Sequence, residues 1–171
     1  MDKFLQWIEK HKKHRALTDS SYKKVYQERY GKNLNNTRVN TELATYGDAV
    51  LKLALCEILW KEEKKKSKKQ EENTSTEKQK TLSECKQDYE SDEILVKVIA
   101  KHYDILQFLR FDTKDDQKPK DYKYTEHKNS YKYIATAIEA CLGAMYMDEN
   151  VSWRDIIEIV KGWKNLIDAN N

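Results

Sequence analysis

Hydrophobic residues recur at helical spacing in several stretches of the chain, and no stretch alternates in the manner of a strand. The most apolar stretch is LATYGDAVLKLALCEILW at residues 43–60, and it lies in a helix expected over about residues 40–62. Similar apolar faces predict helices at about residues 91–111, 130–147 and 153–168. The fold class is therefore predicted to be all-α.

Two of these helices carry an acidic residue inside the apolar face. Asp48 lies on the same side of its helix as the apolar residues three and four positions away, and Glu139 does the same in its own helix. A glycine accompanies each acid, Gly47 beside Asp48 and Gly143 one turn after Glu139. The loss of side-chain bulk permits close approach of either a partner helix or a ligand held by the acids. From the pattern alone, each acid could instead pair with a Lys or Arg of a neighbouring helix.

Charge and composition place the chain among helical proteins with solvated outer faces. The 171 residues include 32 Lys and Arg against 29 Asp and Glu, with only 4 Gly and 1 Pro. The net charge of +3 is too small to indicate nucleic-acid binding by itself. Residues 61–80, KEEKKKSKKQEENTSTEKQK, contain no apolar residue. We expect a solvated helix end that runs into a mobile lysine-rich insertion there, within a single domain that spans residues 1–171.

The cysteines indicate a reducing compartment. Cys56, Cys85 and Cys141 are odd in number and widely spaced, and they show neither a disulfide framework nor metal-ligand spacing. Because there is also no signal peptide and no run of 18 apolar residues, a soluble cytoplasmic protein without a membrane partner is expected.

Four stretches resemble the ribonuclease III family in order and spacing. They are ALTDSSY at residues 16–22, NTELATYGDAVLKLALCEIL at 40–59, LSECKQDYESDEILVKVIAKHYDILQFLRF at 82–111 and ATAIEACLGAMYMD at 135–148. The resemblance implies a helical-bundle endonuclease domain that forms a two-fold homodimer and cuts double-stranded RNA.

The same resemblance implies the chemistry. The family hydrolyses a phosphodiester with water held on Mg²⁺ (or Mn²⁺), for which carboxylate oxygens are suitable ligands. Asp48 and Glu139 take the positions of two of the family's catalytic and metal-binding acids. We therefore expect metal and phosphate to approach the helix at Gly47 and Asp48.

The sequence departs from the family at other acidic positions. Ala44, Thr136 and Thr41 stand where ribonuclease III proteins carry acids, and a further glutamate position falls near Gln79. One interpretation is loss of activity, leaving a dimeric module that binds RNA or a ribonucleoprotein. The other is a resemblance to the Mini-III branch, which keeps one Asp and one Glu and lacks the double-stranded-RNA-binding domain. We favour the second, because LATYGDAV and ATAIEACLG match that branch at both altered positions.

The resemblance also suggests partners. Without an RNA-binding domain, the affinity for duplex RNA should be weak and should fall steeply with salt. Selectivity would come from a structured substrate such as precursor ribosomal RNA, or from a partner such as a ribosomal protein. Candidate phosphate contacts are Lys128, Lys132 and the lysines of residues 61–69. The helix at 43–60 is apolar on more than one face, as expected of a helix that a second copy covers.

Overall fold

The computed structural model describes residues 2–70, 82–111 and 128–170, and helices dominate all three ranges. The longer helices are α1 (Lys3–Lys10), α2 (Tyr22–Tyr30), α3 (Thr41–Gln70), α4 (Leu82–Glu90), α6 (Lys128–Tyr146) and α7 (Trp153–Asp168). A short α5 (Asp92–Ile94) continues as a π-helical turn at Leu95–Ala100, and 3-10 turns lie at Arg15–Leu17, Asn36–Arg38 and Ile105–Gln107. The described residues contain no strand beyond one isolated bridge between Thr18 and Arg110. The predicted all-α class is confirmed.

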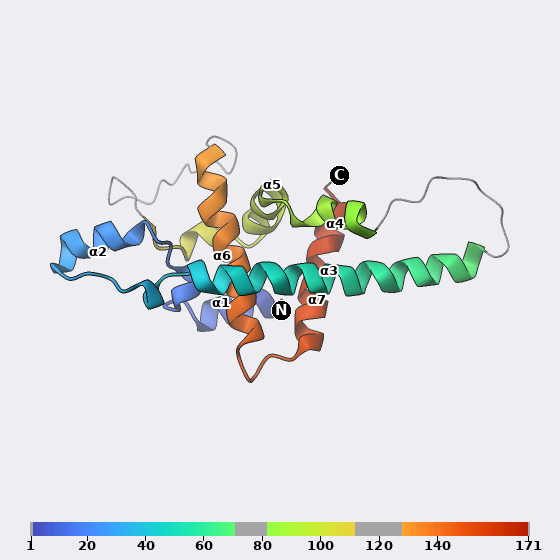
Figure 1. The fold of residues 1–171 in the computed structure, drawn as a ribbon, viewed down its shortest axis with the longest axis horizontal. Coiled ribbons are helices and arrows are strands. Elements are labelled where there is room, and N and C mark those ends of the chain that lie inside the picture. The colour runs from blue at the N-terminus through green and yellow to red at the C-terminus, as the bar shows by residue number, and fades with distance from the viewer. Residues whose placement is uncertain (1, 71–81, 112–127, 171) are drawn as a thin grey trace.

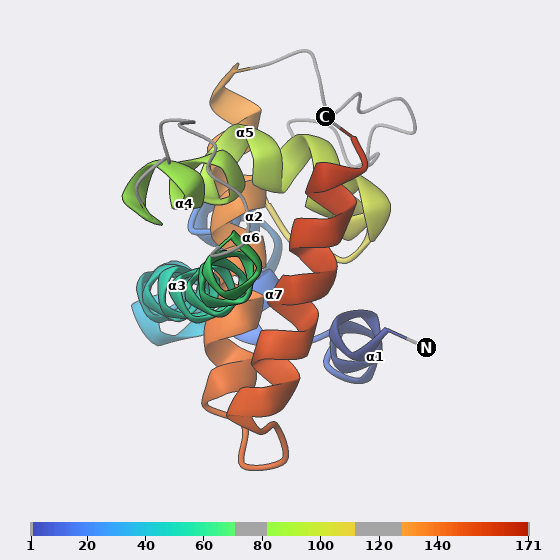
Figure 2. The same cartoon turned by 90° about the vertical axis from the view of Figure 1, so that its right-hand side faces the viewer.

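Helix α3 lies along the longest axis of the molecule (Figure 1). α6 crosses it near its N-terminal half, and α7 runs beside α6 (Figures 1 and 2). α3 continues to Gln70, past the end expected near residue 62. The first half of the segment expected to be a mobile insertion is therefore helix, and residues 71–80 lie outside the described residues.

The core lies where α3, α6 and α7 meet, and α1 closes it from the side opposite α3 (Figure 2). Phe4 of α1 is fully buried and makes edge-on contacts with Tyr103 and Trp163, at ring-centroid distances of 5.0 and 4.9 Å. The largest fully buried side chains of the crossing helices are Leu51, Leu55, Ile134, Ile138 and Leu142. Burial of this apolar surface holds α3 and α6 together.

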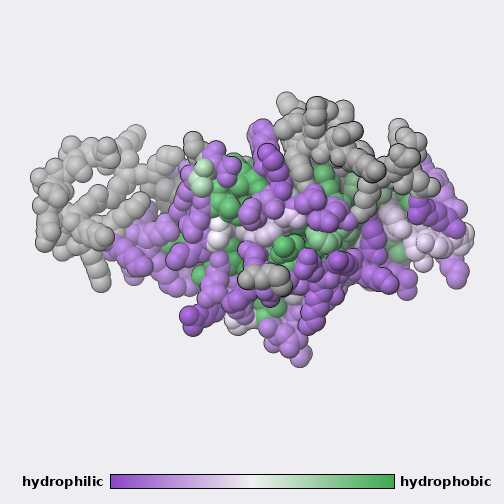
Figure 3. Space-filling view, turned by 180° about the vertical axis from the view of Figure 1, so that it is seen from behind, coloured by the Kyte–Doolittle hydropathy of each residue, from purple (hydrophilic) through white to green (hydrophobic). Residues whose placement is uncertain are grey.

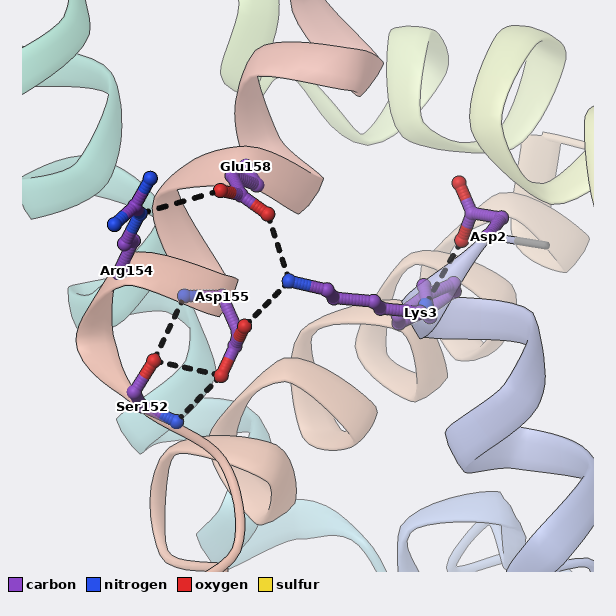
Figure 4. Close-up of polar contacts among 7 residues, drawn as sticks. Asp2, Lys3, Ser152, Arg154, Asp155 and Glu158 are labelled. Carbon is purple, nitrogen blue, oxygen red and sulfur yellow. Dashed lines mark hydrogen bonds and ion pairs between the residues drawn. The ribbon is translucent and has the colours of Figure 1, made fainter.

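Polar contacts fix the start of α7 to α1 (Figure 4). Ser152 and Asp155 form a reciprocal capping box at the first turn of α7. Lys3 Nζ reaches Asp155 at 2.6 Å and Glu158 at 2.7 Å. Because the Lys3 side chain is 49% exposed, these ion pairs orient α1 more than they stabilise the fold.

The face away from α3 is mostly hydrophilic, with hydrophobic residues showing in small patches near the middle (Figure 3). In the part of the chain that the structure describes, no helix is both long and apolar enough to cross a membrane. Cys141 is buried and Cys56 half-buried, and both are free thiols.

Candidate active site

Helices α3 and α6 touch backbone to backbone at two glycines. A Cβ atom placed on Gly47 would lie 1.7 Å from the carbonyl oxygen of Glu139, and one on Gly143 would lie 2.2 Å from the carbonyl oxygen of Leu43. Real Cβ atoms essentially never approach other atoms within 3.0 Å. The glycines therefore allow close approach of the partner helix, and not of a ligand. The backbone of Glu139 fills the space at Gly47, so metal and phosphate do not approach the helix at Gly47 itself, whereas their expected approach at Asp48 stays a prediction.

The same crossing brings the two predicted acids to one cavity. Asp48 follows Gly47 directly, and Glu139 is the residue whose backbone touches Gly47. A cavity of about 330 Å³ opens beside them, and the turn between α4 and α5 forms its other wall. The lining residues are Asp48, Lys52, Gln87, Glu90, Ser91, Asp92 and Glu139. The helix crossing thus builds an acidic cavity from segments far apart in the sequence.

The two acids have different environments. Burial is the main reason that the pKa of Glu139 is raised to about 7, and the negative charges of Asp48 and Asp92 contribute to the rise against the opposing charge of Lys52. The Glu139 carboxylate has no hydrogen-bond or ion-pair partner among the described residues. Asp48 is 41% exposed and accepts a hydrogen bond from Lys52 Nζ at 2.7 Å. The hydrogen bond to Asp48 is the main reason that the pKa of Lys52 is raised.

The family model of the ribonuclease III domain matches residues 41–150, from the start of α3 to just past the end of α6. The chain belongs to the ribonuclease III domain family. No curated protein matches the chain. Family membership supports endoribonuclease activity on structured RNA, and enzymes of this family generally use a divalent metal ion.

Ala44, Thr136 and Thr41, the three positions that the resemblance identifies as altered, supply no carboxylate. Ala44 is buried, with 7% of its surface exposed. Thr136 is half-buried and donates its hydroxyl to the carbonyl oxygen of Lys132 at 2.6 Å. Thr41 is exposed at the start of α3. The position near Gln79 lies outside the described residues.

Two further acids, which no sequence motif marks, line the cavity of this ribonuclease III domain. Glu90 ends α4 and pairs with Lys86 at 3.2 Å. Asp92 lies in the first turn of α5, which Ser91 caps by accepting a hydrogen bond from the backbone N–H of Ile94. No local pattern marks either acid as functional, because only tertiary packing brings the α4–α5 turn to the cavity.

The donor set fits a magnesium ion bound in part by water and substrate. Within the described ranges, no group of three or more His, Cys, Asp or Glu side chains could hold a metal ion alone. Magnesium, however, usually keeps several waters and binds through one or two carboxylates together with substrate phosphate oxygens. Asp48 and Glu139, both facing an open cavity, satisfy that requirement.

Proposed function

We propose that the chain is a divalent-metal-dependent endoribonuclease that cleaves double-stranded or structured RNA by phosphodiester hydrolysis. The observation that carries this proposal is the shared cavity of Asp48 and Glu139, the two residues that the sequence resemblance assigns to family acids. Both would serve as catalytic residues and as ligands of Mg²⁺ (or Mn²⁺).

The roles of these residues follow from their surroundings. A bound divalent ion would supply an activated water and would offset negative charge on the phosphate. Asp48, 41% exposed, offers carboxylate oxygens at the open side of the cavity. Glu139 is more enclosed and, with its pKa near 7, retains a proton at its carboxyl group in part of the molecules at neutral pH. Loss of that proton would complete the pair of anionic ligands.

The reduced set of acids supports assignment to a Mini-III-like branch, with structured RNA such as a ribosomal precursor as substrate. One observation favours the alternative of an inactive RNA-binding or ribonucleoprotein-binding module. Lys52 already neutralises Asp48 at 2.7 Å, as expected where an acid has become structural. The two functions therefore differ in whether a divalent ion displaces that lysine.

We propose further that a second copy of the chain covers the outer face of α3. Tyr46, Leu53 and Trp60 are 54%, 60% and 52% exposed and stand seven residues apart, so they form one stripe along the helix. A two-fold pairing of this stripe would bury the largest exposed apolar side chains of α3 and would place two cavities in one dimer.

Phosphate contacts would come from lysines of α6 and of the protruding end of α3. Lys132 is exposed on α6, and Lys61, Lys64 and Lys65 follow the apolar part of α3. Lys128 begins α6, but its side chain lies outside the described residues. Such contacts would give weak, salt-dependent affinity for duplex RNA.

The test is cleavage of long duplex RNA at low salt with Mg²⁺ or Mn²⁺. Asp48→Asn and Glu139→Gln are each expected to reduce cleavage by about a hundredfold or more, since even outer-shell partners of a metal ligand are worth about 10–100-fold. Glu158→Gln is the matched control, because Glu158 lies on α7 and pairs with Lys3 outside the cavity. Absence of cleavage by the wild type, with RNA still bound, would instead establish the inactive module.

A further inference from the structure

Lys52 is the one basic residue among the described residues that line the cavity. Its Nζ lies 2.7 Å from Asp48 Oδ2, four residues earlier on α3. The negative charges of Glu90 and Glu139 also raise the pKa of Lys52. The ammonium group of Lys52 therefore pairs with Asp48, the more exposed of the two acids.

An ammonium group and a divalent ion compete for the same carboxylate oxygens. Each is attracted by the acids, and each repels the other when both are present. The Lys52 side chain is 43% exposed, and a lysine carries its charge on a flexible stem. It can leave Asp48 without disturbing the fold, provided that another anion receives it. The phosphate of a bound RNA is such an anion.

We propose that Lys52 is a phosphate-binding residue that occupies Asp48 in the RNA-free protein and moves to a phosphate of the bound RNA. This inference rests on the proposed function, because it requires that Asp48 bind a divalent ion. Bound RNA would draw Lys52 away from Asp48, which would leave Asp48 free to bind the metal ion. A bound metal ion would in turn displace Lys52 from Asp48, which would leave Lys52 free to bind a phosphate of the RNA. The two ligands would bind cooperatively, each raising the affinity of the other by the same factor.

The first test measures binding of Mn²⁺ to the RNA-free full chain by electron paramagnetic resonance of the free ion. A unit positive charge about 5 Å from a divalent ion at a solvent-exposed site lowers the ion's affinity about tenfold. Lys52→Met should therefore bind Mn²⁺ about tenfold more tightly than the wild type. Lys52→Arg keeps the charge and should bind as the wild type does.

Lys61→Met is the matched control. Lys61 bonds Glu57 at 2.5 Å with the same four-residue spacing on the same helix, but neither residue lines the cavity. This variant should leave Mn²⁺ affinity unchanged within about twofold, because the removed charge lies roughly 13 Å further along α3.

The second test measures duplex RNA cleavage at saturating Mn²⁺. Lys52→Met should cleave at least about tenfold more slowly than the wild type, although it binds the metal more tightly, because one charged phosphate contact is lost. Tighter Mn²⁺ binding would follow from loss of the Lys52 charge even if the ion pair were merely structural. The slower cleavage at saturating Mn²⁺ is therefore the readout that distinguishes a phosphate-binding Lys52 from a structural one. Equal Mn²⁺ affinity in Lys52→Met and wild type, or unimpaired cleavage by Lys52→Met, would overturn the inference. If none of the proteins binds Mn²⁺, or if Asp48→Asn binds it as well as the wild type, it is the proposed metal site that fails, and the inference fails with it.

Discussion

The contact between α3 and α6 makes Gly47 the residue whose substitution tests the fold most directly. In Gly47→Ala, the new methyl group would lie 1.7 Å from the carbonyl oxygen of Glu139, against at least 3.4 Å for an ordinary contact. The difference requires a movement of about 1.7 Å between the two helices. Because the obstacle is helix backbone and not a flexible side chain, no rotamer change can relieve it.

The cost follows from two opposing effects. Alanine is favoured over glycine in a helix interior by about 1 kcal/mol. Overpacking typically costs about 1–3 kcal/mol, and here the helices must also separate. Separation loosens the fully buried Leu51 and Leu142, and a gap of even 0.5–1 Å forfeits about a quarter to a half of a dispersion contact. We expect a net loss of about 3–5 kcal/mol, out of the roughly 5–15 kcal/mol that stabilises a typical domain.

Urea denaturation followed by circular dichroism measures this loss as a lower midpoint at unchanged slope. Gly162→Ala is the matched control, because Gly162 lies in α7 and a Cβ there meets nothing within 4 Å. That variant should be more stable than the wild type by about 0.5–1 kcal/mol. If Gly47→Ala gains stability as Gly162→Ala does, the close crossing is refuted.

Two further predictions concern charge and assembly. Because the pKa of Glu139 rises from 4.5 to about 7 in the folded chain, the folded state binds more protons between these values and loses stability as pH rises through them. We compare the free energy of unfolding in urea of metal-free Glu139→Gln with that of the wild type. The advantage of Glu139→Gln should be about 1–2 kcal/mol larger at pH 8 than at pH 5, a value that allows for the partial solvent exposure of Glu139. An equal advantage at both pH values would contradict this prediction. Leu53→Glu, at a side chain 60% exposed on α3, should give a monomer in sedimentation equilibrium where the wild type is a dimer, and a wild-type monomer would reject the proposed pairing.

The spacing of residues was sufficient to predict the all-α class and most of the long helices. Helical periodicity drew attention to Asp48 and Glu139, because each interrupts an apolar face. It left an ion pair with a neighbouring helix open, and only the resemblance to ribonuclease III gave both acids an expected catalytic and metal-binding role. Lys52 could have been found by periodicity as well, since an acid followed by lysine four residues later is a common ion pair on a helix. The role of Gly47 was misassigned because a sequence does not tell which atoms fill the space left by a missing side chain.

Other features depended on information that periodicity does not carry. The end of α3 was placed near residue 62 because the apolar residues stop there, yet the helix continues to Gln70. Lysine and glutamate are good helix formers without any apolar neighbour, and Lys61 pairs with Glu57 within the same helix. Glu90 and Asp92 reach the cavity only through packing of the α4–α5 turn, which no local pattern specifies.

The adjacency of Gly47 and Asp48 now has a physical reason. The glycine lets the backbone of α6 approach closely enough that its carbonyl oxygen at Glu139 would lie 1.7 Å from a Cβ atom. At this crossing, Asp48, the residue after the glycine, and Glu139, the residue opposite the glycine on α6, line the same cavity. A bulkier residue at position 47 would therefore move Glu139 away from Asp48 as well as destabilise the core. In any Gly47 variant that still folds, weaker coupling between the two carboxylates should lower the pKa of Glu139 toward its ordinary value.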